Sequence, residues 1–133
     1  MREMTEPVPS VAQEQSAPDS IRAEISREMV RLYKEVFGRG PTKARTEFAG
    51  PDIVICTLEN SLTLAERKLV ELGEHQRLRD TRMYFQHATE NQFREVIERI
   101  TGRRVRAFVS GIDTVVDVSS EVFHLEDGPR NPD

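Results

Sequence analysis

Apolar residues recur with helical spacing in the first patterned stretch of the chain, between residues 20 and 37. Their intervals of three and four residues place them on one stripe of a helix. The stripe consists of Ile21, Ile25, Met29, Leu32 and Val36, widened by Tyr33 and Phe37. Asp19 or Ser20 can cap the first turn, and Gly38 can adopt the left-handed conformation that ends a helix. These signals predict a helix over residues 20–37.

Two later stretches carry strand patterns. Residues 53–58 (Ile-Val-Ile-Cys-Thr-Leu) form a short, largely β-branched apolar run, which is typical of a strand covered on both faces. Residues 103–110 alternate between polar and apolar side chains, which predicts a second strand with one polar face at its start. A turn at residues 111–114 is then expected to lead into a third strand.

The last predicted strand changes the side on which its apolar residues fall. Val116 and Val118 share one phase of the alternation, whereas Phe123 and Leu125 share the other. Because side chains alternate with a period of two along a strand, this change of phase requires an extra residue. The sequence therefore predicts a β-bulge at Ser119–Ser120.

Two helices are predicted between the first and second strands. Thr63 and Glu66 have the spacing of a capping box, so a short helix is expected to follow and to end at about Gly73. Three leucines of this helix are expected to face inward: Leu64, Leu69 and Leu72. Residues 74–100 then continue a helical pattern for roughly 40 Å, at about 1.5 Å per residue. The apolar stripe is thin over residues 81–92, which indicates partial exposure or packing on a second chain.

The order helix, strand, helix, helix, strand, strand favours an α+β fold. We expect a small antiparallel or mixed three-stranded sheet with helices mainly on one face. A single domain is expected over residues 20–126, between flexible polar tails at 1–19 and 127–133. Because a core of this size is thin, we also expect a homodimer formed through a helix face or a sheet edge.

The most unusual stretch is the basic turn after the first helix, residues 38–45 (Gly-Arg-Gly-Pro-Thr-Lys-Ala-Arg). Pro41 prevents the helix from continuing, and the spacing of Gly38 and Lys43 differs from that of a Walker phosphate loop. Solvated cations at a helix end are one interpretation. An anion site assisted by the backbone N–H groups of Thr42 and Lys43 is the other. The candidate ligand- or partner-binding residues are Arg39, Gly40, Thr42, Lys43 and Arg45, with Arg82 and Arg103 from later in the chain.

Few residues are candidates for catalysis. Cys56 lies inside an apolar strand, where a thiol is typically inert. Glu66 is explained by the capping box, and a structural role is also at hand for Asp117. The three histidines lack the i,i+4 spacing of a helical metal pair, so neither a metal site nor a cofactor is expected: His75, His87 and His124.

Composition narrows the classes of function. The 133 residues include 19 Lys or Arg and 23 Asp or Glu, a net charge of −4, so no overall positive field attracts nucleic acid. The arginines near residues 77–82 and 103–106 leave weak nucleic-acid binding as an alternative. A single cysteine suits a reducing compartment, and no run of about 18 apolar residues could span a membrane. We therefore expect a cytoplasmic protein.

Several of these motifs occur together in one known family. They are Gly38-Arg39-Gly40-Pro41-Thr42 with Lys43, Ala44 and Arg45; Leu62-Thr63 with Glu66; Arg82; Thr101-Gly102-Arg103 before Val105; Asp117; and Val122-Phe123. Over about residues 20–126 the chain resembles the MpsC-like family, named after a proposed sodium-translocating, membrane-potential-generating system. The resemblance implies association with membrane proteins similar to a proton-pumping dehydrogenase subunit and with a large soluble partner, in systems linked to bicarbonate uptake. It implies no catalytic residues.

Three functions are compatible with the sequence. The favoured one is a soluble, non-enzymatic accessory or regulatory protein, which binds an anion or a partner at the basic turn and contacts transporter subunits through its surface. The second is a small enzyme that acts on an anionic substrate through Glu66, Asp117 or Cys56. The third is a weak nucleic-acid binder. A concave pocket with a titratable group beside basic partners would favour the enzyme.

Overall fold

The computed structural model describes residues 18–127, which form four helices and four strands. In chain order the elements are α2 (Asp19–Phe37), β2 (Lys43–Phe48), β3 (Ile53–Glu59), α3 (Leu64–Glu71), α4 (His75–Ala88), α5 (Glu90–Thr101), β4 (Val105–Asp113) and β5 (Val118–Leu125). The tails expected at 1–19 and 127–133 lie outside the described residues, except for positions 18, 19 and 127. Within residues 18–127, none of the helices combines the length and apolar character needed to cross a bilayer.

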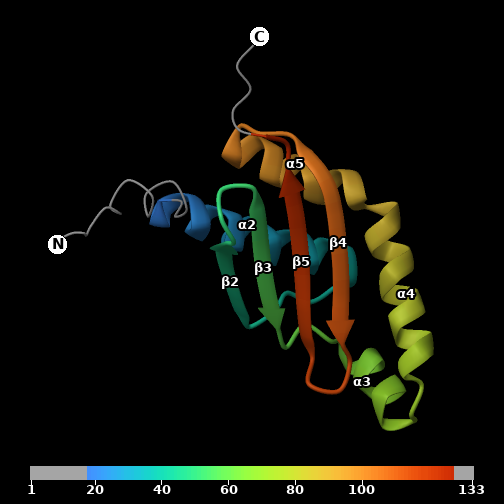
Figure 1. The fold of residues 1–133 in the computed structure, drawn as a ribbon. Helices are drawn as coiled ribbons and strands as arrows, with labels where there is room; N and C mark the ends of the chain where they lie inside the picture. Colours follow the sequence, from blue (N-terminus) through green and yellow to red (C-terminus); the bar gives the residue numbers. More distant parts are fainter. Residues whose placement is uncertain (1–17, 128–133) are drawn as a thin grey trace, which may run out of the picture.

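The strands form one antiparallel sheet in the order β2-β3-β5-β4 (Figure 1). The predicted α+β class is confirmed, but the sheet has four strands rather than three. Residues 43–45 were expected in the basic turn, and no strand was predicted over residues 43–48, where every second side chain is charged. These side chains are exposed on β2: Lys43, Arg45 and Glu47. Charged residues of this kind are typical of an edge strand, which is where β2 lies.

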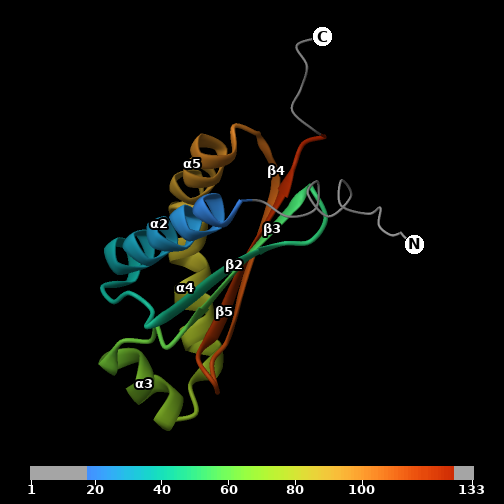
Figure 2. The same cartoon turned by 90° about the vertical axis from the view of Figure 1, so that its left-hand side faces the viewer.

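The helices lie on one side of the sheet, and no described residue forms a layer over its other face (Figure 2). α2 packs on β2 and on α5, and the core is formed where these elements meet. Its fully buried side chains come from both layers: Ile25, Met29, Tyr33, Val54, Phe93, Ile97 and Phe123. The prediction that the helices cover mainly one face is confirmed.

The single long helix predicted over residues 74–100 is wrong, because α4 and α5 are separate helices that meet at Thr89. Thr89 has φ −113° and ψ 16°, and its hydroxyl donates a hydrogen bond to the Phe85 carbonyl at 2.7 Å. A threonine bonded in this way competes with the helical hydrogen bonds of the backbone. The break allows α5 to pack on α2 while α4 runs alongside β4 (Figure 1).

The closing hairpin differs from the prediction in its turn and in its bulge. The chain turns at residues 114–117 rather than at 111–114. β5 alternates without interruption, so the bulge predicted at Ser119–Ser120 is wrong, and the register shift lies in β4 between Val105 and Ala107. An unbroken alternation places Glu121 on the inward face of β5, where it is fully buried.

α3 begins with the predicted capping box. Thr63 Oγ1 accepts a hydrogen bond from the Glu66 N–H at 3.2 Å, and Glu66 Oε1 accepts one from the Thr63 N–H at 2.8 Å. The inward orientation expected for its leucines is wrong at two positions, because Leu64 is 83% exposed and Leu72 is 74% exposed. α3 projects beyond one end of the sheet (Figure 1), and its Leu64 side chain extends into solvent.

Candidate functional site

The basic turn is held rigidly against the end of α2. Gly38 caps the helix with φ 87°, and its N–H donates to the Lys34 carbonyl at 2.9 Å. Gly40 lies so close to α2 that an added Cβ would come within 3.3 Å of Val30 Cγ1. The two glycines thus permit a sharp exit from the helix and a close approach of the turn to its side.

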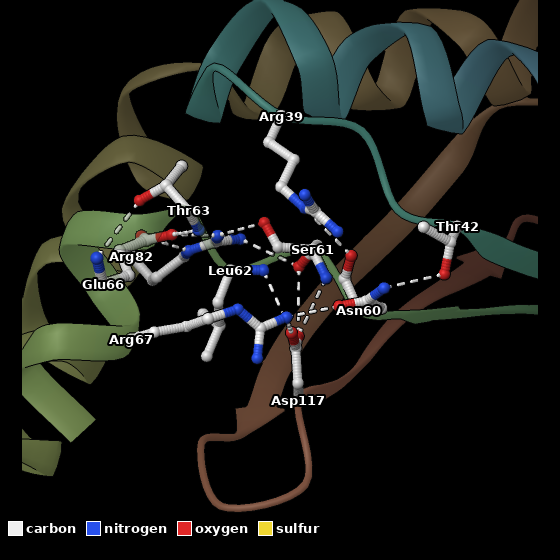
Figure 3. A network of polar contacts seen from close by, with 10 residues as sticks. All are labelled: Arg39, Thr42, Asn60, Ser61, Leu62, Thr63, Glu66, Arg67, Arg82 and Asp117. Carbon is white, nitrogen blue, oxygen red and sulfur yellow. Dashed lines mark hydrogen bonds and ion pairs between the residues drawn. The ribbon is translucent and has the colours of Figure 1, made fainter. Parts of the chain in front are cut away.

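The turn contacts the segment that links β3 to α3, residues 60–63 (Figure 3). Arg39 Nε donates to the Asn60 carbonyl at 3.3 Å, and Asn60 Nδ2 donates to Thr42 Oγ1 at 3.1 Å. The Thr42 N–H donates to the Glu59 carbonyl at 3.0 Å. This amide belongs to the end of the sheet, so the contribution to an anion site expected from the Thr42 N–H is not available.

Asp117 fixes the same linking segment from the opposite side (Figure 3). Its carboxylate accepts from the Ser61 N–H at 3.0 Å and from the Leu62 N–H at 3.1 Å, and Arg67 Nη2 lies 3.3 Å from it. Asp117 also has φ 60°, a left-handed conformation that aspartate tolerates better than most residues. Because the carboxylate satisfies two buried backbone donors, Asp117 has a structural role.

Arg82 joins α4 to this cluster and is only 4% exposed. Its guanidinium binds both carboxylate oxygens of Glu66, at 2.8 and 2.6 Å, and donates to the Ser61 carbonyl at 3.1 Å. The same group lies 3.9 Å from the centre of the Phe37 ring. Burial tends to raise the pKa of Glu66, but the Arg82 and Thr63 hydrogen bonds outweigh it and hold the pKa below its ordinary value. Arg82 is therefore committed to protein contacts rather than to an open anion site.

The remaining sequence-predicted cations lie apart from one another. Arg45 points to the outer face of β2, exposed and 3.7 Å from Glu47. Arg103 lies at the far end of the sheet, where it binds Asp52 at 2.5 Å and the Pro51 carbonyl at 2.6 Å. A six-residue strand separates this end from the basic turn, about 20 Å at roughly 3.3 Å per residue. The structure thus brings together Arg39, Gly40, Thr42 and Arg82 around the linking segment. It does not bring Lys43, Arg45 or Arg103 to them.

A shallow hollow of about 730 Å³ lies between the basic turn and the first turn of α3. Its lining residues are Lys34, Gly38, Arg39, Gly40, Thr63, Leu64 and Ala65. Within the described part of the chain, Lys34, Arg39 and the neighbouring Lys43 form no ion pair with a carboxylate. We call this surface, formed by Lys34, Arg39 and Leu64, the basic corner. Lys43, like Arg45, lies on the exposed side of β2. The basic corner combines unpaired positive charge with an exposed leucine.

A buried carboxylate that the sequence interpretation missed lies deeper, behind Arg82. Glu121 accepts hydrogen bonds from the Tyr33 hydroxyl and, at 2.5 Å, from Gln86 Nε2. Burial raises the pKa of Glu121 to about 7, and it raises the pKa of Tyr33 well above its ordinary value. Strict alternation back from Phe123 and Leu125 would have revealed the inward position of Glu121, but the opposite phase of Val116 and Val118 led to the predicted bulge instead.

Cys56 is buried in β3, 3.7 Å from the Thr46 hydroxyl. Burial raises the pKa of its thiol to about 12, so the reactive thiolate is scarcely populated at neutral pH. Glu66 and Asp117 hold the linking segment in place. The three residues considered for catalysis therefore all have structural environments.

Sequence comparison relates the chain to known proteins. The family model described as "Na+-translocating membrane potential-generating system (MpsC)" matches residues 18–127. The Bacillus subtilis (strain 168) protein named "Uncharacterized protein YbcI" is 27% identical over 107 residues, which cover 80% of this chain and 86% of the relative. No solved structure matches the chain significantly. Since the family model covers every residue that the structure describes, the chain belongs to the MpsC family.

Proposed function

We propose that this protein is an accessory or regulatory component of the membrane-potential-generating system after which its family is named, and that it binds a partner protein through the basic corner. The observation that carries the proposal is the set of cations without carboxylate partners beside an exposed leucine. We also propose that it acts in the cytoplasm, in contact with the membrane subunits of that system.

The shape and chemistry of the basic corner favour a protein segment over a small anion. The hollow is shallow, and the Thr42 N–H that could have enclosed an anion is bonded within the sheet. Leu64, 83% exposed, offers an apolar contact beside Arg39 that a free anion could not use. An acidic segment with one apolar side chain would satisfy both features, since charge complementarity directs the encounter and buried apolar area stabilises the complex.

The contacts give less support to the other two functions. Glu66, Asp117 and Cys56 hold structural positions, as described above, and this favours binding over catalysis. Of the arginines considered for nucleic acid, Arg77 pairs with Glu74 at 3.4 Å and Arg103 is bound to the 51–52 loop. These pairs lower the positive charge available to phosphates.

Removing the charge of the basic corner should weaken partner binding at least about tenfold. This corresponds to a loss of at least about 1.4 kcal/mol of binding free energy. The test variant carries Lys34→Ala with Arg39→Ala, and binding to the purified membrane subunits in detergent is measured by surface plasmon resonance. The parent affinity should fall as salt is raised, and the variant should show a smaller salt dependence.

A matched control carries Arg27→Ala with Arg104→Ala, because these exposed arginines also form no ion pair within residues 18–127 and their removal changes the net charge equally. Equal losses in the two double variants, or none in either, would contradict the assignment to the basic corner.

Calorimetric titration of the parent with bicarbonate, phosphate and nucleotides tests whether the basic corner binds a small anion instead of a protein. Small-anion binding that disappears in the Lys34 and Arg39 variant would make the corner an anion site instead.

We also propose a homodimer formed through the uncovered face of the sheet (Figure 2). Ile55, Val122 and Val109 lie side by side on the three strands β3, β5 and β4, and Val109 is 57% exposed. Sedimentation equilibrium should give a dimer for the parent and a monomer for Val109→Glu, whose thermal stability should hardly change because the site faces solvent. Val115→Glu, in the hairpin turn where Val115 is 75% exposed, should leave the dimer intact. A monomeric parent would contradict the proposal.

A further inference from the structure

A cavity of about 190 Å³ lies between α4, the end of α2 and the β4–β5 end of the sheet. Its apolar walls come from Tyr33, Phe37, Met83 and Ile112. Met83 is 59% exposed, so the cavity opens to solvent beside it. An engineered cavity of about 150 Å³ is large enough to hold benzene. The cavity therefore has the volume for one six-membered ring with a small substituent.

The serine hydroxyls of the wall already have partners inside the protein. Ser110 interacts with the Glu121 carboxylate, and Ser119 interacts with Tyr33. The Gln86 side chain is likewise turned toward the protein, since its Nε2 donates to Glu121 at 2.5 Å. Because these groups are bonded within the fold, the inner part of the cavity favours an apolar body over one that carries polar groups.

The two arginines of the wall differ in what they can bind. Arg82 is 4% exposed, and its guanidinium holds both carboxylate oxygens of Glu66. Arg79 is exposed, and within residues 18–127 it forms no ion pair with a carboxylate. A guanidinium of this kind can bind a carboxylate through two parallel hydrogen bonds. The positive charge that an occupant can use is therefore at Arg79.

Arg79 lies at the end of the cavity near the hairpin turn, because its guanidinium reaches the Thr114 hydroxyl at 3.5 Å. Gln86, which is bonded to Glu121, follows two turns later on α4, about 10 Å away at roughly 1.5 Å per residue. A carboxylate bound at Arg79 would thus be well separated from the buried carboxylate of Glu121. The apolar part of the same molecule could extend from Arg79 into the cavity.

We propose that this cavity is a binding site for a small aromatic carboxylate, whose carboxylate group pairs with Arg79 and whose ring packs against Phe37, Met83 and Ile112. The ring walls and the Met83 thioether favour an aromatic body, since edge-to-face ring contacts and sulfur–aromatic contacts are stabilising. An ammonium group in place of the carboxylate would be repelled by both arginines. The site is separate from the basic corner, so the inference does not depend on the partner proposed above.

Three probes test the proposal on the full chain by two-dimensional amide NMR: phenylacetate, its uncharged isostere phenylacetamide, and acetate, which lacks the ring. At millimolar concentrations phenylacetate is expected to give saturable shifts centred on the amides of Gly111, Ile112 and Gln86. Its affinity should exceed that of phenylacetamide about fivefold, the upper range for an ion pair at an exposed position, and the excess should shrink as salt is raised. Acetate should give no saturable shifts at these amides.

Variants of the arginines locate the site. Arg79→Gln should lower the affinity for phenylacetate to that for phenylacetamide and leave phenylacetamide unaffected. Arg77→Gln is the matched control, because Arg77 is also exposed on α4 but does not line the cavity, and it should leave both affinities unchanged. Met83→Ala, at the exposed mouth, should weaken both ring probes.

Four outcomes would overturn the proposal. They are the absence of saturable shifts with phenylacetate, equal affinities for phenylacetate and phenylacetamide, acetate binding as tight as that of phenylacetate, and a loss in Arg79→Gln no larger than that in Arg77→Gln. Acetate binding of this strength would reduce the site to a surface contact between an anion and Arg79.

Discussion

Replacement of Arg82 by alanine should cost about 3–5 kcal/mol of the free energy of unfolding, the range observed when one partner of a buried ion pair is removed. The side chain is 4% exposed and binds Glu66 through two nitrogens, at 2.8 and 2.6 Å. Its removal leaves Glu66 without its cation and the Ser61 carbonyl without a donor. A loss of 1 kcal/mol lowers the melting temperature of a domain of this size by roughly 4–8 °C. The melting temperature of Arg82→Ala should therefore lie more than about 10 °C below that of the parent.

The same helix provides a control. Arg79 lies one turn before Arg82 but is exposed, and within residues 18–127 its side chain donates hydrogen bonds only to Gln76 at 3.2 Å and to Thr114 at 3.5 Å. Arg79→Ala should therefore change the free energy of unfolding by no more than about 0.5 kcal/mol. Arg82→Lys keeps the charge but loses the two-pronged contact, and its stability should fall between those of the parent and Arg82→Ala. A loss for Arg82→Ala no larger than that for Arg79→Ala would contradict the structural role of the pair.

The parts of the fold that the sequence predicted correctly have local causes. The end of α2 is set by Gly38, and the start of α3 by Thr63 and Glu66, all within one turn of the residues they affect. The missed strand β2 depends on distant partners instead. Its inward residues Ala44 and Thr46 are only weakly apolar, and they acquire a strand conformation because Thr57 and its neighbours on β3 offer backbone hydrogen bonds.

The candidate site, too, was predicted only where its residues are neighbours in the sequence. The glycine-rich basic turn was visible because its residues adjoin one another in the chain. Its dependence on Asn60 and Asp117 was not, since Asp117 is 56 residues from Ser61 in sequence but accepts a hydrogen bond from it. Glu121 was hidden for a further reason, because its inward position requires partners from α2 and α4 that no single segment contains. Buried polar groups of this kind are specified by tertiary contacts rather than by local pattern.

Glu121→Gln should stabilise the protein by about 3 kcal/mol at pH 8 and remove part of its pH dependence. In the folded state the pKa of Glu121 is raised from 4.5 to about 7, which at roughly 1.4 kcal/mol per unit corresponds to about 3 kcal/mol. Between these two values the folded state binds more protons than the unfolded chain. Stability therefore decreases as the pH rises from about 4.5 to 7 and stays reduced above that range. Glutamine keeps an acceptor for Gln86 Nε2 and the Tyr33 hydroxyl but carries no charge to desolvate.

Urea denaturation near pH 5 and near pH 8 measures this difference for the parent, for Glu121→Gln and for Glu47→Gln. Glu47 is an exposed carboxylate on β2, with 60% of its side chain accessible, so its variant should follow the parent at both pH values. The Glu121 variant should gain stability over the parent mainly at the higher pH. An equal gain at both pH values would show that packing rather than ionisation is responsible. A lower stability of Glu121→Gln than of the parent at pH 8 would contradict this prediction. It would mean that the ionised carboxylate stabilises the contacts with Tyr33 and Gln86, and thereby the packing of α4 on the sheet.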